Sequence, residues 1–433
     1  MFLGATYLRC LFVFPNAPLA ADFSGGASRY LSSYLALTQL ADEVHVFRLL
    51  KDDCRNKVLR YEDQCKAEQH RLRAQAASWR DVNYSRMVGF RGRTDLLWRA
   101  SRRPLEVSSP EVYALHKPLS EIVAQVRPDF VWAEWILSGA LATASDLRMP
   151  WVYAHHDWSH RISILRREAS REPASIGGQV FEWSLRRSEV QILRHSTAVV
   201  TGSHTEAQEI CALGGRHVEV IPTTYDSVAL SSLEQRPAQP ARVVHLGSLS
   251  TTANYLGLKA YLEKVHPRFS TRHRSSFDFW VVGDNSSGKP ELLRQLRAAG
   301  ANLTGHVSPL DEVLRPFDIA IIPYEQNTGT RTKLPLLFNY AQVVVATRAA
   351  VAGSSELLDG ENCIVLPSLA DFADEIVSLA SDPKRRQRIG LAAKETFEKH
   401  FTLQAQMPAF QRVVACVTNN YLCSAREPTS LVR

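Results

Sequence analysis

Short apolar runs alternate with longer segments of helical periodicity along almost the whole chain, and this alternation constrains the fold more than any other feature. CLFVF (10–14) and EVHVFRL (43–49) are typical of buried strands, because they are short and rich in β-branched and aromatic residues. The segment between them, residues 27–41, repeats apolar residues at roughly helical spacing and predicts a crossover helix. Strands joined by helices of this length predict parallel sheets covered on both faces, so we expect an α/β fold.

The strands fall into two series, which predicts two domains in the 433 residues. Candidate strands of the first series are 10–14, 43–49, 129–135, 151–155, 197–202 and 218–222, and those of the second are 242–247, 277–283, 301–307, 319–323, 343–347 and 363–367. We expect two Rossmann-like, doubly wound domains at 1–230 and 242–395, a polar, proline-containing linker at 231–241, and a C-terminal region at 396–433. Ligands of such sheets bind beyond the carboxyl ends of the strands, so we expect the active site in the cleft between the two sheets.

Composition excludes several other classes of protein. Hydrophobic residues make up 45% and charged residues 22% of the chain, as in soluble globular proteins, and no apolar run approaches the ~18–20 residues that span a bilayer. The apolar start is interrupted by Arg9 and is interpreted as a first strand rather than a secretion signal. The seven cysteines are scattered without metal-ligand or redox spacing, which favours a reducing cytoplasm and predicts no metal site.

The net charge of +7 is concentrated in one segment, residues 51–104, which contains 14 basic and 7 acidic residues. One interpretation is a solvated, partly helical face. The other is a surface for anionic lipid headgroups or an acidic substrate. Nucleic acid is not expected as a partner, because no motif of a nucleic-acid-binding protein accompanies the charge.

A candidate anion site follows the strand at 319–323. The stretch NTGTRTKLPLL places Gly329 in a polar turn, Arg331 and Lys333 just after it, and a helix start near Leu334 or Pro335. Free amides at a helix start, the helix dipole and two cations together favour a phosphate or pyrophosphate. The alternative is a loop of exposed basic residues.

Two further candidates lie at expected strand ends in the first series. Gly25 and Gly26 precede the first helix, where paired glycines let backbone amides approach a ligand. His155, His156 and Asp157 follow the strand at 151–155, and adjacent residues of a strand face opposite ways, so only one histidine can enter a given site. The alternatives are an ordinary turn and a histidine satisfied by local hydrogen bonds. The chain contains neither the dinucleotide-binding glycine fingerprint nor a nucleophile-elbow motif.

The chain resembles the retaining, family 4-type glycosyltransferases (glycosyl transferases group 1) with the GT-B fold. The resemblance lies in four segments, which occur in the same order as in that family. The segments are SGGASRYLSSYLALTQLADEVHVF, AVVTGSHTEAQEICALGGRHVEVIPTTYD, VVHLGSLSTTANYLGLKAYLEKVHP and the long stretch that begins GTRTKLPLLFNYAQVVVAT. The resemblance covers roughly residues 10–400.

The resemblance implies a nucleotide-sugar donor held mainly by the C-terminal domain and a glycan, lipid-linked or other glycoconjugate acceptor held by the N-terminal domain. It implies no cofactor and no metal, since basic side chains and a helix terminus take the charge of the diphosphate. It implies catalytic roles for His156, Arg331 and Lys333, with His155 and Asp157 as alternates to His156. The donor-binding residues that it implies are Gly25, Gly26, Gly247, Ser248, Gly305, Val307, Thr328, Gly329 and Thr330. The final helices would cross back to the first domain.

Some positions depart from the family pattern. Thr328 and Leu336 stand where these enzymes usually have two glutamates, and Ser248 and about Asn254 stand where they usually have an arginine and a lysine. Three explanations remain: altered donor contacts in an active enzyme, a degenerate protein that serves as binding partner or scaffold, or a shifted register that brings Glu325 to the site. A nucleotide-sugar epimerase on the same fold is a further alternative.

We therefore expect a glycosyltransferase that acts, with retention, in the synthesis of a cell-surface polysaccharide or other glycoconjugate. We expect it in the cytoplasm or peripherally on the inner face of the membrane.

Overall fold

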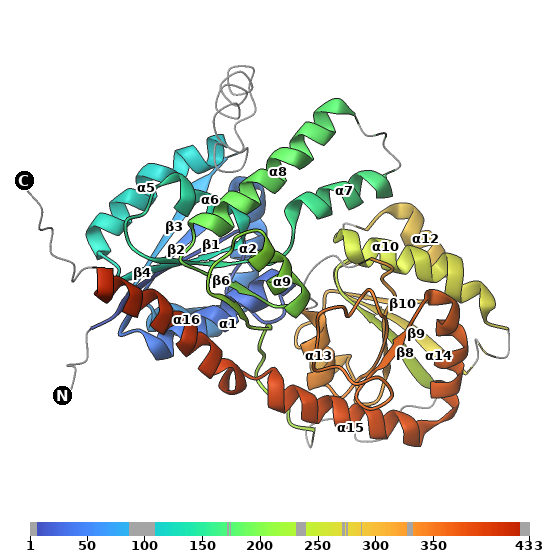
Figure 1. The fold of residues 1–433 in the computed structure, drawn as a ribbon. Coiled ribbons are helices and arrows are strands. Elements are labelled where there is room, and N and C mark those ends of the chain that lie inside the picture. The colour runs from blue at the N-terminus through green and yellow to red at the C-terminus, as the bar shows by residue number, and fades with distance from the viewer. Residues whose placement is uncertain are drawn as a thin grey trace, which may run out of the picture. The chain divides into compact units, whose positions relative to one another are not determined.

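The computed structural model describes residues 7–85, 109–170, 173, 175–230, 240–270, 273, 276–286, 288–326 and 332–424. The chain divides into two compact units (Figure 1). Unit 1 is Met1–Ile164, Pro173–Pro222 and Gln406–Arg433, and unit 2 is Leu165–Glu172 and Thr223–Ala405. The units therefore change at 222/223, ahead of the expected linker, of which only residues 240 and 241 are described. The last helical segment belongs to unit 1 from Gln406 onward.

Unit 1 contains a seven-stranded parallel sheet in the order β3-β2-β1-β4-β5-β6-β7. Its strands are β1 (Arg9–Pro15), β2 (Glu43–Lys51), β3 (Ser78–Tyr84), β4 (Phe130–Glu134), β5 (Trp151–Ala154), β6 (Ala198–Thr201) and β7 (Val218–Val220). All six strands expected for this series are confirmed. β3 was not expected, because its sequence SWRDVNY is polar, as suits a strand at the edge of the sheet.

Helices cover both faces of this sheet. They are α1 (Gly25–Leu40), α2 (Asp52–Gln64), α3 (Lys66–Gln75), α5 (Pro110–Val126), α6 (Trp135–Ala144), α7 (Ser159–Ala169, which continues into unit 2), α8 (Ile176–His195), α9 (His204–Ala212) and α16 (Leu403–Ser424, which begins in unit 2). Successive residues of a strand point to opposite faces of the sheet, so they pack against different helices. Leu11 and Val13 belong to the core beneath α5, α6 and α8, whereas Phe12 and Phe14 stack on Tyr34 and Tyr30 of α1.

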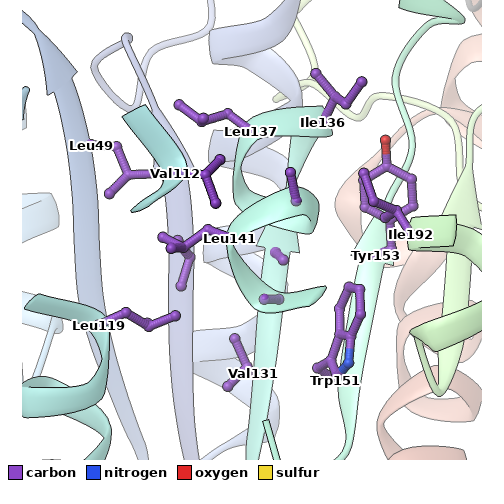
Figure 2. Packing of buried hydrophobic residues seen from close by; sticks show 14 of the residues in the cluster. Leu49, Val112, Leu119, Val131, Ile136, Leu137, Leu141, Trp151, Tyr153 and Ile192 are labelled. Carbon is purple, nitrogen blue, oxygen red and sulfur yellow. The ribbon is translucent and has the colours of Figure 1, made fainter. Parts of the chain in front are cut away.

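The core beneath α5, α6 and α8 is made of aliphatic and aromatic side chains (Figure 2). Figure 2 shows Leu119 of α5 and Leu141 of α6 beside Val131 of β4, and Ile192 of α8 beside Tyr153 of β5. α6 can lie this close because Gly139 has no side chain: a Cβ there would come within 2.7 Å of Ile192 and 2.9 Å of Tyr153. On the other face, Trp132 packs against Phe410 of α16, with ring centroids 5.8 Å apart.

Unit 2 contains a six-stranded parallel sheet in the order β10-β9-β8-β11-β12-β13. Its strands are β8 (Ala241–Leu246), β9 (Phe277–Val282), β10 (Asn302–Gly305), β11 (Ile319–Ile322), β12 (Val343–Thr347) and β13 (Ile364–Leu366). Each of the six strands expected in this series is confirmed, so the doubly wound α/β fold is confirmed for both units.

The helices of unit 2 again lie on both faces. They are α10 (Thr252–Ala260), the π-helix η2 (Tyr261–Val265), the 3₁₀ turns η3 (His266–Arg268), η4 (Leu310–Glu312) and η5 (Leu369–Asp371), α12 (Pro290–Ala298), α13 (Lys333–Asn339), α14 (Phe372–Ser381) and α15 (Pro383–His400). One face packs against α10, α12 and α14, through residues such as Leu258, Leu296 and Ile376. The other packs against α13 and α15, through residues such as Phe338 and Phe397.

Each sheet reverses its strand order once, and ligands of doubly wound sheets bind at this reversal. In unit 1 the reversal lies between β1 and β4, and in unit 2 between β8 and β11. The loops that follow these four strands are therefore the places where functional side chains are expected.

A buried carboxyl group lies at the opposite end of β11. Asp318 is 1% exposed, and its carboxylate is 3.6 Å from Arg242 Nη1. Burial raises the pKa of Asp318 to about 7, although Arg242 opposes the rise. The folded state therefore binds this proton more tightly than the unfolded state does, so the contribution to the free energy of unfolding falls as pH rises from 3.8 to about 7.

Asp318→Asn is expected to remove this pH dependence, because the amide resembles the protonated carboxyl. Between pH 5 and a folded-state pKa of about 7 lie two pH units, which correspond to about 2.7 kcal/mol. From pH 5 to pH 8 the free energy of unfolding of the variant should therefore rise by about that amount relative to the wild type. Urea unfolding at the two pH values measures the difference. An identical change with pH in both proteins would show that Asp318 does not titrate in this range.

Candidate functional site

The two adjacent histidines after β5 lie on opposite faces of the unit 1 sheet. His155 is fully buried on the face of Tyr153, with its ring 4.6 Å from the Trp158 ring. His156 lies on the face of α1, with its ring 5.3 Å from that of Tyr30. Only His156 is therefore on the side of the sheet where the glycine turn begins α1.

His156 is held by a carboxylate that the sequence analysis did not single out. Nε2 of His156 is 2.6 Å from Oε2 of Glu134, the last residue of β4, and Trp132 Nε1 donates to the other carboxylate oxygen at 2.8 Å. Glu134 is completely buried. A glutamate inside an otherwise apolar strand was the available signal, since ionised residues are rarely fully buried without a partner. Its partner, His156, is 22 residues away and could not be assigned without the strand order.

Burial and charge together keep His156 neutral. Burial lowers the pKa of His156 below 6.5, Arg29 lowers it further, and the hydrogen bond to Glu134 opposes both effects. A neutral imidazole that donates from Nε2 to Glu134 has its acceptor lone pair on Nδ1. His156 is thus arranged to accept a hydrogen bond from a hydroxyl group.

Arg29, one turn into α1, is a second residue that the sequence analysis missed. It is 3% exposed, and within the described part of the chain neither terminal guanidinium nitrogen has a hydrogen-bond partner. Its charge lowers the pKa of both His155 and His156. A buried arginine without a full set of hydrogen bonds is costly, and such groups are typical of functional sites.

The glycine turn leaves room at the start of α1. Ser24 caps the helix, with its hydroxyl accepting from the Ala27 amide at 3.1 Å. A Cβ added to Gly26 would approach no atom closer than 3.9 Å, so packing within the chain does not require glycine there. This observation fits the expected approach of a ligand to Gly25 and Gly26, whose role stays a prediction.

In unit 2, the ammonium group of Lys333 lies at the reversal point of the sheet. It donates to the carbonyl oxygen of Leu246 at the end of β8 (2.5 Å), to Asn254 Oδ1 on α10 (2.6 Å) and to the hydroxyl oxygen of Tyr324 after β11 (2.5 Å). Tyr324 and Asn254 are also hydrogen-bonded to each other. The expected helix is confirmed and begins at Lys333 itself. We call Lys333, Asn254 and Tyr324 the lysine cluster.

The backbone around the lysine cluster is closely packed. Gly247 has φ +136° and Gly283 has φ +139°, which other residues rarely adopt. A Cβ on Gly283 would lie 2.6 Å from the Gly247 carbonyl, and a Cβ on Gly257 would lie 2.3 Å from the Tyr324 ring. Gly283 thus lets the end of β9 approach the end of β8, and Gly257 lets α10 approach Tyr324 of the lysine cluster.

Ser248 and Asn254 both take part in this arrangement. The Ser248 hydroxyl is bonded to Ser250 Oγ (2.8 Å) and donates to the Asp284 carbonyl (3.3 Å). Asn254 Nδ2 donates to the Ser248 carbonyl at 2.7 Å, which leaves its Oδ1 for Lys333 and Tyr324. Asn254 thus connects the turn after β8 to the ammonium group.

The remaining expected residues are placed as follows. Gly305 ends β10 with φ +76°, and a Cβ there would meet nothing within 4 Å; Val307, two residues later, is partly buried. Glu325 is half-exposed and accepts both its hydrogen bonds from Lys264, each 2.7 Å long, rather than from the lysine cluster. Asp157 is partly buried beside His156. Thr328, Gly329, Thr330 and Arg331 lie outside the described residues.

No group of three histidine, cysteine or acidic side chains suited to a metal ion occurs among the residues that the structure describes. Of the cysteines with described side chains, Cys10, Cys54, Cys65, Cys211 and Cys363 form no disulfide. Metal independence of the reaction stays a prediction.

Family models match both halves of the chain. The model described as Glycosyltransferase Family 4 matches residues 25–227, and the model described as Glycosyl transferases group 1 matches residues 240–382. The chain belongs to this glycosyltransferase family. The enzyme class and the two-domain GT-B fold expected from the sequence are thereby confirmed. A search of curated protein sequences gives no match.

Solved structures of GT-B enzymes share the fold of this glycosyltransferase at low sequence identity. HepE from Anabaena in complex with UDP-glucose is 14% identical, with 94% of this chain and 100% of HepE covered and a TM-score of 0.61. Sucrose-phosphate synthase from Thermosynechococcus elongatus is 12% identical, with 96% and 100% covered and a TM-score of 0.64. A TarM variant from S. aureus, in complex with fondaparinux, alpha-GlcNAc-glycerol and UDP, is 9% identical, with 95% and 99% covered and a TM-score of 0.64.

Leu336, Ser248 and Asn254 of this glycosyltransferase depart from the family pattern, and the structure shows the surroundings of each. Leu336, at one usual glutamate position, is a partly buried apolar residue packed against the core beneath α13. Neither Ser248 nor Asn254 carries a charge, but the ammonium of Lys333 lies within hydrogen-bonding distance of Asn254. Positive charge is therefore present beside the position where the family usually has a lysine.

Proposed function

We propose that the glycosyltransferase transfers a sugar from a nucleotide-sugar donor, bound at the strand ends of unit 2, to a hydroxyl group of a glycan, lipid-linked or other glycoconjugate acceptor, with retention. The observation that carries the proposal is the position of the Lys333 ammonium group, at the reversal point between β8 and β11. A cation at this point, with backbone amides nearby, suits the leaving diphosphate, whose negative charge increases as the glycosidic bond breaks.

The ammonium group acts here through its charge as well as through hydrogen bonds. An ammonium group has three N–H donors, and three acceptors already surround Nζ of Lys333. A phosphate oxygen would replace one of these acceptors or interact with the charge at slightly longer range. In either case the lysine cluster fixes the charge in one place before the donor binds, so little reorganisation is needed.

His156 supports the acceptor side of the proposal. With Nε2–H donated to Glu134, Nδ1 can accept the proton of a sugar or acceptor hydroxyl group and orient its oxygen. The start of α1 at Gly25 and Gly26 lies on the same face of the sheet and has space for a ligand. We assign His156 to positioning the transferred sugar or the acceptor, and Arg331, with Lys333, to the diphosphate.

Calorimetric titration with UDP, GDP and their glucose and mannose derivatives tests donor binding directly. UDP is the first nucleotide to test, because the HepE and TarM structures are complexes with UDP. We expect one nucleoside diphosphate to bind with micromolar to low millimolar affinity, equally well with and without EDTA. Absence of binding by every nucleotide at millimolar concentration would contradict the enzyme proposal and leave the binding-partner alternative. Loss of affinity with EDTA would contradict metal independence.

Product analysis separates the transferase from an epimerase. A transferase needs an acceptor to turn over its donor efficiently, whereas an epimerase converts the donor alone. Conversion of the donor sugar to its epimer without acceptor would favour the epimerase.

The membrane contact expected for residues 51–104 stays a proposal. The described part of this segment, 51–85, contains 8 basic and 6 acidic residues, so most of the excess charge belongs to residues 86–104, outside the described part. Among the described helices, none is long and apolar enough to cross a membrane. The cytoplasmic location is proposed from the scattered cysteines, and the place at the inner face of the membrane from the basic charge of residues 51–104.

A further inference from the structure

Exposed apolar side chains gather on one helix, α8, drawn in green in Figure 1. Of the nine large hydrophobic side chains that are exposed in the described part of the chain, four belong to its first two turns. These are Ile176 (83% exposed), Val180 (57%), Phe181 (44%) and Trp183 (58%). Single exposed hydrophobic residues need no explanation, but a cluster on one helix is typical of an interaction surface.

Three of these residues form a continuous stripe. Ile176, Val180 and Trp183 are separated by four and three positions, so they lie one above the other on the helix, and Arg187 continues the same line. The opposite side of α8, with Leu185 and Ile192, is buried in unit 1. The stripe therefore faces away from the core. The helix has two apolar faces, and only the face with Leu185 and Ile192 packs against unit 1.

The charge on the exposed side of α8 is mainly positive. Arg186, Arg187 and Arg194 are exposed, and the Arg187 guanidinium lies 4.7 Å from the centre of the Trp183 ring. Of the two acidic residues, Glu189 is buried and bonded to Ser159 and His160, and Glu182 is only partly exposed. The first part of the exposed face is thus apolar with a tryptophan, and the second part is basic.

We propose that this stripe, Ile176, Val180 and Trp183 with Arg186 and Arg187, binds the surface of a bilayer that contains anionic lipids. Apolar side chains with a tryptophan enter the boundary between headgroups and acyl chains, while arginines at the same helix bind phosphate groups. An exposed face that combines these residues with no fully exposed carboxylate complements an anionic lipid surface. The proposal concerns a surface outside both strand-end sites, so it is independent of the proposed reaction.

Flotation with lipid vesicles tests the proposal on the full chain. The wild type should float with vesicles of phosphatidylcholine and phosphatidylglycerol and remain at the bottom with phosphatidylcholine alone. The triple variant Ile176→Ser, Val180→Ser, Trp183→Ser should lose at least tenfold in partition onto the anionic vesicles, and Arg186→Glu with Arg187→Glu should lose a similar factor. Tyr113→Ser is the matched control, since Tyr113 on α5 is an equally exposed aromatic residue (66%) away from the stripe, and it should bind as the wild type does.

The results distinguish a lipid bilayer from a second copy of the chain as the partner of this face. Full binding by the triple variant, or failure of the wild type to bind anionic vesicles, would overturn the proposal. Loss of binding only in the arginine variant would indicate electrostatic adsorption without insertion, which also contradicts it. If the triple variant instead converts a dimer to a monomer in light scattering and the wild type binds no lipid, the face is an interface between copies of the chain. Circular dichroism of each variant should match the wild type, because all substituted side chains are exposed.

Discussion

Replacing Lys333 by alanine is expected to weaken the binding of the nucleoside diphosphate by about 1.5–3 kcal/mol, or roughly 10- to 150-fold in Kd. The physical reason is the loss of the charged group at the reversal point of the unit 2 sheet, where it is held by Leu246, Asn254 and Tyr324. Calorimetry with UDP or the nucleotide that binds best measures the change. The loss should shrink as salt is added, because part of it is Coulombic.

Two control variants separate charge from packing. Tyr324→Phe removes one acceptor of the ammonium group but keeps the charge, so its Kd should change less than that of Lys333→Ala. Lys259→Ala removes a nearby α10 lysine whose ammonium lies 3.8 Å from Glu263 and should leave Kd unchanged. Unaltered affinity in a folded Lys333→Ala protein would exclude a role for this lysine in donor binding.

The second large effect is expected for Glu134→Gln. This change keeps the size of the side chain but removes the charge that holds His156. We expect kcat to fall by about 10²-fold, which is the lower end of the rate contribution of a positioned general acid or base. Burial already lowers the pKa of His156, and Glu134 opposes this effect. Removal of the carboxylate should therefore lower the pKa of His156 further.

The pH profile gives this prediction a readout that lost packing would not produce. If neutral His156 is the active form, activity falls as pH decreases through its pKa, so the acidic limb of the profile should move to lower pH in Glu134→Gln while the plateau drops. Glu206→Gln is the matched control. Glu206 is equally buried beside His155, on the other face of the sheet, and should leave the acidic limb in place. An unshifted limb in Glu134→Gln would show that Glu134 does not act through His156.

The fold could be predicted from the sequence almost completely, and the site only in part. Twelve of the thirteen strands in the described part of the chain were expected, because a strand buried on both faces has to be a continuous apolar run. β3 was missed because an edge strand can be polar. The glycine turn, the histidine pair and Lys333 were recognised because each follows an expected strand. Glu134 was missed although it interrupts an apolar strand, because its partner His156 can be assigned only from the strand order. Arg29 was missed because nothing in the local sequence shows that it is buried.

The sequence by itself determined that this chain forms two doubly wound domains and placed its polar candidates at the carboxyl ends of strands, since these properties follow from local periodicity and from the position of turns. Only the tertiary structure decided which histidine faces α1, that Glu134 holds it, and that Lys333 is bonded to Asn254 and Tyr324. The reason is that strand order joins β4 to β5 and β8 to β11 across long stretches of sequence. Contacts between residues as far apart as Asn254 and Lys333 depend on that order, and no local pattern of residues records it.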